Sequence, residues 1–139
     1  MLKKTITYVD MNGDERTEDF YFHMFAHEVT RLQAKLGYDD LTEGVKAIVK
    51  NGTLANVLSL IEDIILGSYG IKTPDGRGFI KPAAEKEKFE YSQAYAELFE
   101  ELLSKPENME AFAKGMTAST KKPTQQEPKQ PTPIQPLNR

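Results

Sequence analysis

Residue types able to do chemistry are sparse in this 139-residue chain. His23 and His27 lie four positions apart with Glu28 alongside, and two histidines at that spacing on a helix can share a metal ion. The order is His-x-x-x-His-Glu rather than the His-Glu-x-x-His of zinc peptidases, and His23 falls where a strand is expected to pass into a helix. We therefore expect no metal site and two ordinary, half-exposed histidines.

A second candidate is the segment Gly76-Arg77-Gly78, because glycine-rich backbone can cradle a phosphate. The longer glycine-rich fingerprints are missing, so this signal is weak. No nucleophile is paired with a base in the sequence. The chain has no cysteine, which excludes disulfides and thiolate zinc sites. We therefore expect neither an enzyme nor a bound cofactor.

Charge is distributed unevenly along the chain. Residues 119–139 hold four basic residues, one acidic residue and five prolines, whereas the whole chain has a net charge of −3, which leaves −6 on residues 1–118. An acidic body argues against nucleic-acid binding, which depends on clustered lysine and arginine. No apolar run is long enough to span a bilayer. We expect a soluble domain over residues 1–118 and a disordered Pro/Gln/Lys-rich tail over residues 119–139.

Two strands are expected near the N-terminus. Ile6 and Tyr8 alternate along the first, and Phe20 and Phe22 along the second. A two-residue Asn-Gly turn would place these apolar side chains on opposite faces of the hairpin. A three-residue loop that ends in a left-handed Gly13 places them on one face, so we predict that register. A lone hairpin is marginal in water, so its apolar face must pack on helices.

Helical periodicity fills most of the remaining body. The expected helices cover residues 25–36, 41–51, 54–66, 83–104 in two pieces, and 106–116. Their ends carry the usual signals, namely Gly37, Asp40, Thr53, Ser92 and Pro106. The third helix is apolar around most of its circumference, which predicts that it lies at the centre. The expected fold is α+β and mainly α, with an N-terminal β-hairpin packed on a bundle of about five helices.

The connection over residues 68–81 separates two helical blocks. Gly70 follows the apolar run directly, so we expect it to end the helix in the left-handed conformation. Residues 73–76, Thr-Pro-Asp-Gly, fit a type I turn. The flanks Ile71 and Phe79-Ile80 would then fold back as a short hairpin or tight loop. The residues leave open whether this segment is a structural connector or a loop that faces a partner.

Several short motifs occur in a characteristic order. One set lies at Tyr69-Gly70, Asp75-Gly76, Phe79, Lys81, Phe89 and Ala94-Tyr95; the other runs from Thr7-Tyr8-Val9-Asp10 through Asn12-Gly13 to Phe20-Tyr21-Phe22. In order and spacing these motifs resemble the tail assembly chaperones of long-tailed (siphovirus-like) bacteriophages over roughly residues 1–116. The sequence departs from that family's pattern at Pro74 and Gly78, which bears on the shape of the loop.

The resemblance implies a chaperone that binds the tape-measure protein, keeps it soluble and helps the tail-tube protein polymerise around it, with no catalytic residue. It implies a second partner, the major tail protein, reached through a longer product of ribosomal frameshifting near Lys121-Lys122. It also implies residence in the host cytoplasm and absence from the mature virion, and it leaves homo-oligomers open. The candidate partner-binding residues are Tyr69, Asp75, Gly76, Phe79, Lys81 and Tyr95.

Aromatic residues are numerous for a small domain, and most are expected in the core. Were Tyr69, Phe79 or Tyr95 to form an exposed patch, that patch would suit the apolar helices of a client. The alternative function is a small nucleic-acid-binding regulator that uses the turn at residues 73–76 as a wing. The acidic body argues against this alternative.

Overall fold

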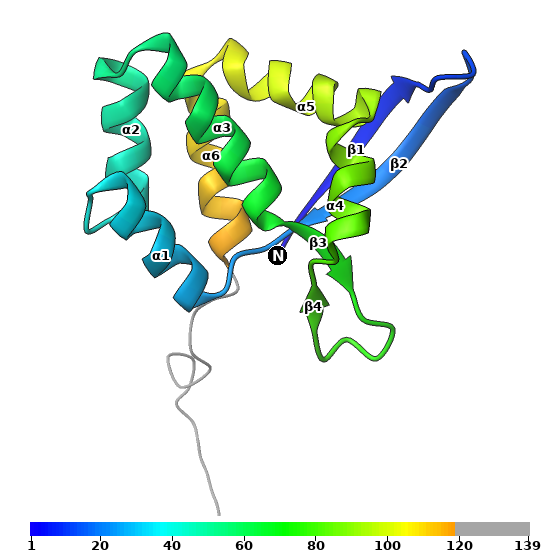
Figure 1. The fold of residues 1–139 in the computed structure, drawn as a ribbon, viewed down its shortest axis with the longest axis horizontal. Helices are drawn as coiled ribbons and strands as arrows, with labels where there is room; N and C mark the ends of the chain where they lie inside the picture. Colours follow the sequence, from blue (N-terminus) through cyan, green and yellow to red (C-terminus); the bar gives the residue numbers. More distant parts are fainter. Residues whose placement is uncertain (119–139) are drawn as a thin grey trace, which may run out of the picture.

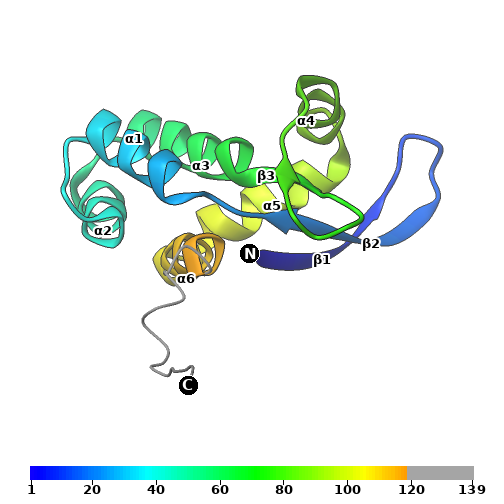
Figure 2. The same ribbon diagram turned by 90° about the horizontal axis from the view of Figure 1, so that it is seen from below.

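The computed structural model describes residues 1–118, which form four strands and six helices (Figures 1 and 2). The strands are β1 (Leu2–Val9), β2 (Glu15–Phe22), β3 (Tyr69–Lys72) and β4 (Phe79–Ile80), and the helices are α1 (Ala26–Leu36), α2 (Leu41–Asn51), α3 (Leu54–Ser68), α4 (Ala83–Glu90), α5 (Gln93–Ser104) and α6 (Pro106–Thr117). The α+β, mainly helical prediction is confirmed, with six helices where about five were expected. The predicted tail over residues 119–139 and the Lys121-Lys122 pair lie outside the described residues.

The N-terminal hairpin has the predicted register. β1 and β2 pair in antiparallel fashion with Ile6 opposite Glu18, which requires a three-residue loop. Gly13 ends that loop with a φ of 85°. The apolar side chains consequently share one face, and Ile6 and Phe22 are buried in the core. That face packs on the helices, because α5 and α6 both contact β1.

Helix α3 lies at the centre of the molecule, as its composition predicted. It contacts α2, α5 and α6. Leu60, Ile61, Ile64 and Ile65 on α3 are each no more than 1% exposed. Burying a side chain of this size stabilises a fold by about 1.5–3 kcal/mol, so this helix is a major source of the folding free energy.

The C-terminal end of α3 differs from the prediction. Gly70 is a residue of β3 and not a left-handed cap. Three other donors satisfy the last carbonyl groups of the helix. The Ser68 hydroxyl donates to the preceding turn, the backbone N–H of His23 donates to the Ser68 carbonyl at 2.8 Å, and Lys81 Nζ donates to the Gly67 carbonyl at 2.7 Å. Because these donors satisfy carbonyl groups at the end of α3, no left-handed capping residue is needed. The chain passes directly from the helix into an extended strand.

The other predicted helix ends are confirmed. Gly37 has a φ of 83° after α1. Asp40, Thr53 and Ser92 each accept a backbone N–H through the side chain at the start of α2, α3 and α5, and Pro106 opens α6. These local signals position five of the six helices.

The sheet has the order β1-β2-β3-β4, but the β1–β2 hairpin and the β3–β4 hairpin are joined by very few paired residues. β3 pairs with β2 only through Gly70 opposite Tyr21 and Tyr69 opposite Phe22. Beyond Gly70 the chain leaves β2 and pairs with β4 instead. The β3–β4 hairpin therefore projects from the body, while the far end of the β1–β2 hairpin extends away from the helices in another direction (Figure 1).

Candidate functional site

The tip of the β3–β4 hairpin is braced by its own polar groups. The N–H of Gly76 donates to the Thr73 carbonyl at 2.9 Å, which confirms the predicted turn over residues 73–76. The Asp75 carboxylate accepts from the backbone N–H of Arg77 at 3.0 Å and from the Thr73 hydroxyl at 2.7 Å. These two hydrogen bonds hold the pKa of Asp75 below its usual value. The tip is thus an ordered turn, although Asp75 and Gly76 are exposed.

The base of the hairpin explains why position 70 is glycine. A Cβ atom at Gly70 would lie 2.6 Å from the carbonyl oxygen of Ile80 and 2.6 Å from Cε2 of Phe79. Backbone cannot give way as a flexible side chain does. The glycine therefore serves a close approach of two strands and not a left-handed turn.

The two histidines lie in different environments. His23 is 6% exposed, and its ring lies edge-on to Phe25 at 4.7 Å, whereas His27 is exposed and stacks on Phe25 at 5.9 Å. The expectation that both are half-exposed is wrong for His23, because Phe25 and Phe79 cover the junction between β2 and α1. Burial, then the positive charges of the N-terminus and Lys81, holds the pKa of His23 below its usual value. Within residues 1–118, no three His, Cys, Asp or Glu side chains are arranged to hold a metal ion.

Lys81 joins three parts of the fold. Its Nζ lies 2.8 Å from each carboxylate oxygen of Glu28 in α1 and 2.7 Å from the Gly67 carbonyl in α3. The two side chains are only 14% and 26% exposed. Glu28 sits in the first turn of α1 and Lys81 at the C-terminal end of α3, where the helix dipoles favour these charges.

The pKa values of the pair reflect its enclosure. Burial lowers the pKa of Lys81, and the adjacent Glu28 acts in the opposite direction. Burial alone would raise the pKa of Glu28, but hydrogen bonds from Lys81 and from the backbone N–H of Phe25 hold it below its usual value. Lys81 therefore anchors the hairpin to α1 and α3, because its ammonium group is bound by Glu28 and by the Gly67 carbonyl.

Tyr69 and Tyr95 meet in a cluster of aromatic rings. Tyr69 stacks on Phe89 with centroids 4.3 Å apart, and Tyr95 meets the same ring edge-on at 5.6 Å. Phe20 lies 5.1 Å from Phe89 and Phe22 lies 5.9 Å from it. Burial, together with nearby carboxylates of α3 and α4, raises the pKa of Tyr95 to about 12. The cluster joins the first hairpin to α4 and α5.

The six candidate residues do not form one exposed patch. They divide into an exposed tip, a hairpin base and a half-buried ring cluster: Asp75 and Gly76, then Phe79 and Lys81, then Tyr69 and Tyr95. The exposed apolar residues of this hairpin are instead Ile71 and Ile80, which pair across β3 and β4 and are 36% and 50% exposed. Sequence reasoning missed this pair as a surface. The sequence does carry a signal for this surface: neighbouring residues in a strand point to opposite faces, so if Phe79 faces the body, Ile80 faces solvent.

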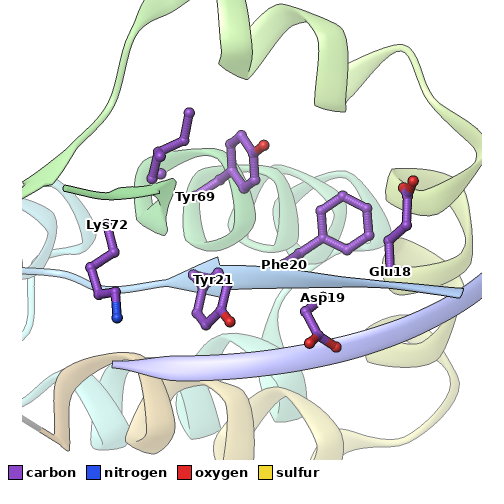
Figure 3. A pocket seen from close by; sticks show the side chains of 8 residues that line it. Glu18, Asp19, Phe20, Tyr21, Tyr69 and Lys72 are labelled. Atoms are coloured by element: carbon purple, nitrogen blue, oxygen red, sulfur yellow. The ribbon is translucent and has the colours of Figure 1, made fainter. Parts of the chain in front are cut away.

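A groove of about 470 Å³ lies between β2 and the start of the projecting hairpin (Figure 3). Phe20 and Tyr69 lie on one side of β2, and Asp19 and Tyr21 on the other. The full lining is Glu18, Asp19, Phe20, Tyr21, Tyr69, Gly70, Ile71 and Lys72.

These features define a small α+β protein whose surface offers a projecting hairpin and a groove beside a strand. A family model described as phage tail assembly chaperone matches residues 1–133, and the chain belongs to this family. The resemblance inferred from the motifs is thereby confirmed. No curated protein and no solved structure matches the chain. Over residues 1–118, none of the helices is both long and apolar enough to cross a membrane.

Proposed function

We propose that this tail assembly chaperone binds the tape-measure protein, keeps it soluble before assembly and promotes polymerisation of the tail-tube protein around it. The family match over residues 1–133 carries the proposal. A chaperone of this kind acts by binding, which lowers the concentration of the aggregation-prone client by mass action, and needs no catalytic residue. It would act in the host cytoplasm and be absent from the finished virion.

We assign the client-binding surface to the outer face of the β3–β4 hairpin. Ile71 and Ile80 expose apolar side chains there, next to the ordered tip at Asp75 and Gly76. Covering apolar area contributes roughly 25 cal/mol per Å², and a braced surface loses little entropy on binding. In this scheme Phe79 supports the surface from the opposite face of the hairpin, Lys81 anchors the base of the hairpin, and Tyr69 and Tyr95 belong to the neighbouring ring cluster.

Co-expression with the tape-measure protein of the same phage tests the proposal. The wild-type chain is expected to keep the client in the supernatant and to co-purify with it. The double variant Ile71→Thr with Ile80→Thr is expected to remain folded by circular dichroism and to lose the client. Val9→Thr with Met11→Thr is a matched control, because these residues are 53% and 79% exposed at the tip of the other hairpin.

Two results would count against the proposal in different ways. A client that stays insoluble with wild-type chaperone in stoichiometric excess overturns the chaperone function. A client lost equally by both double variants, or by neither, overturns the assignment of the surface and leaves the function standing.

Contact with the tail-tube protein is proposed to depend on a longer product made by frameshifting near Lys121-Lys122. Mass spectrometry of the natively expressed gene is expected to find both lengths. Detection of the short product alone would remove this part of the proposal.

A further inference from the structure

Strand β2 has one paired edge and one open edge. On one side it pairs with β1 along its whole length. On the other side it pairs with β3 only at Tyr21 and Phe22. No other strand among residues 1–118 pairs with that side, so residues 15–20 leave a strand edge of the kind that accepts a further strand.

The alternation of hydrogen-bonded pairs between β1 and β2 shows which backbone groups of β2 lie at the open edge. The N–H of Asp10 donates to the Asp14 carbonyl at 2.8 Å, so the even-numbered residues of β2 direct their backbone groups towards β1. The odd-numbered residues direct theirs outward. Tyr21 follows this rule, because it is paired with Gly70 of β3. The outward groups that precede it belong to Glu15, Thr17 and Asp19.

The side chains along this edge differ between its two faces. On the face towards the helices, Phe20 and Tyr69 line the groove of about 470 Å³ (Figure 3). On the opposite face, Glu15 and Asp19 are exposed carboxylates on either side of Thr17. A strand added here would alternate its own side chains between two faces. One face carries Phe20, Tyr69 and Glu18, and the other carries Glu15 and Asp19, with Lys72 beside Tyr21 (Figure 3).

We propose that the open edge of β2 binds an extended segment of another protein as an added strand, with apolar side chains facing Phe20 and Tyr69 and basic side chains facing Glu15 and Asp19. The added strand gains main-chain hydrogen bonds from the edge and specificity from the alternate side chains. The groove shares Ile71 with the outer face of the β3–β4 hairpin, but the outward backbone groups of Glu15, Thr17 and Asp19 belong to β2 alone. The inference therefore does not depend on which protein the hairpin face binds.

Charge gives a second copy of the chain no net advantage at the same edge. In a two-fold pairing of β2 with β2 centred on Thr17, each Glu15 would lie opposite Asp19 of the other copy. These like-charge pairs repel, whereas each Arg16 would lie opposite Glu18 of the other copy and attract it. Self-pairing therefore gains little from charge, and a basic strand gains more.

A peptide titration of the full chain, followed by amide NMR, tests the inference. The probe is a capped eight-residue peptide of alternating lysine and valine. Its matched control alternates lysine and proline, which keeps the charge but cannot form a strand ladder. The first peptide is expected to shift the amide signals of Glu15, Thr17 and Asp19 and to slow their exchange with solvent. The second is expected to leave them unchanged.

Variants that remove negative charges provide a second test of the inference. Glu15→Gln with Asp19→Asn keeps the shape of both side chains and is expected to weaken binding of the lysine–valine peptide about fivefold. Glu100→Gln with Glu107→Gln removes two charges on α5 and α6 and is expected to leave the affinity unchanged.

Each of four results would overturn the inference. Equal shifts with both peptides would mean a charge effect without strand addition, and no shift with either would mean an edge that accepts no strand. Edge amides that are already protected in the free chain would mean that the chain covers its own edge. Shifts that depend on protein concentration alone would mean that a second copy does so.

Discussion

Removal of the Lys81 ammonium group should uncouple the β3–β4 hairpin from α1 and α3. Lys81→Met keeps much of the apolar stem and deletes the donor that lies 2.8 Å from both Glu28 oxygens and 2.7 Å from the Gly67 carbonyl. Breaking a fully buried ion pair costs about 3–5 kcal/mol. Glu28 is 26% exposed and can regain water, so we expect a smaller loss, about 2 kcal/mol. For a body of this size that is a melting temperature lower by about 8 °C.

Thermal and urea unfolding measure this loss, and a double-mutant cycle isolates its cause. Glu28→Gln combined with Lys81→Met is expected to show a coupling of about 1–2 kcal/mol. Lys88→Met is the matched control, because Lys88 is 76% exposed and lies 3.5 Å from Glu85; its effect should stay below about 0.5 kcal/mol. A Lys81→Met protein as stable as the control, or a coupling near zero, would refute the anchoring role.

The Glu28–Lys81 ion pair should also make the free energy of unfolding depend on pH in the acid range. Although burial acts to raise it, the pKa of Glu28 lies below its usual value in the folded chain. The stability that Glu28 contributes is therefore fully present above its unfolded pKa of about 4.3 and is lost as the pH falls through the lower folded value. Unfolding free energies between neutral pH and pH about 3 should fall more steeply for wild type than for Glu28→Gln.

Further predictions concern packing and charge. Gly70→Ala should lower stability by at least about 2 kcal/mol in urea melts, since its Cβ would meet a β4 carbonyl, while Gly78→Ala, whose nearest contact would be 3.4 Å, should cost less. Ile61→Asp should abolish the cooperative thermal transition, because Ile61 is 0% exposed and the charge would be unpaired. Tyr69→Ala should cost about 2–4 kcal/mol by removing the ring stacked on Phe89, so a native-like melt would contradict the cluster. In gel-shift assays at modest salt the chain should leave duplex DNA unshifted, and a shift would favour the nucleic-acid-binding alternative.

Local patterns predicted much of the fold. The parity of Ile6 against Phe20 decided the hairpin register, and capping residues such as Asp40 and Thr53 set helix starts, because neighbours along the chain determine these features. The end of α3 escaped prediction for the opposite reason. Its carbonyl groups are satisfied by the N–H of His23 and by Lys81, neither of which belongs to the helix.

The candidate site was predicted as a segment but not as a surface. The turn containing Asp75 was recognised, since its residues bond to one another. The partner of Lys81 lies 53 positions away in sequence, so nothing nearby indicated that this lysine is an internal anchor. The stacking of Tyr69 on Phe89 likewise depends on where α4 packs. The open edge of β2 depends on where β3 departs, which is a property of the assembled sheet.

The first strand of the chain packs against its last described helix, and this affects folding on the ribosome. A Cβ at Gly115 would lie 2.9 Å from the Leu2 side chain, and the N–H of Met24 donates to the Met116 carbonyl at 2.9 Å. At about 5–20 residues per second, the β1–β2 ribbon would wait on the order of 10 s for α6 to emerge. During that interval its apolar face has no α6 to cover it. Such a nascent ribbon would be a natural substrate for the general chaperones of the host before the protein can serve as a chaperone itself.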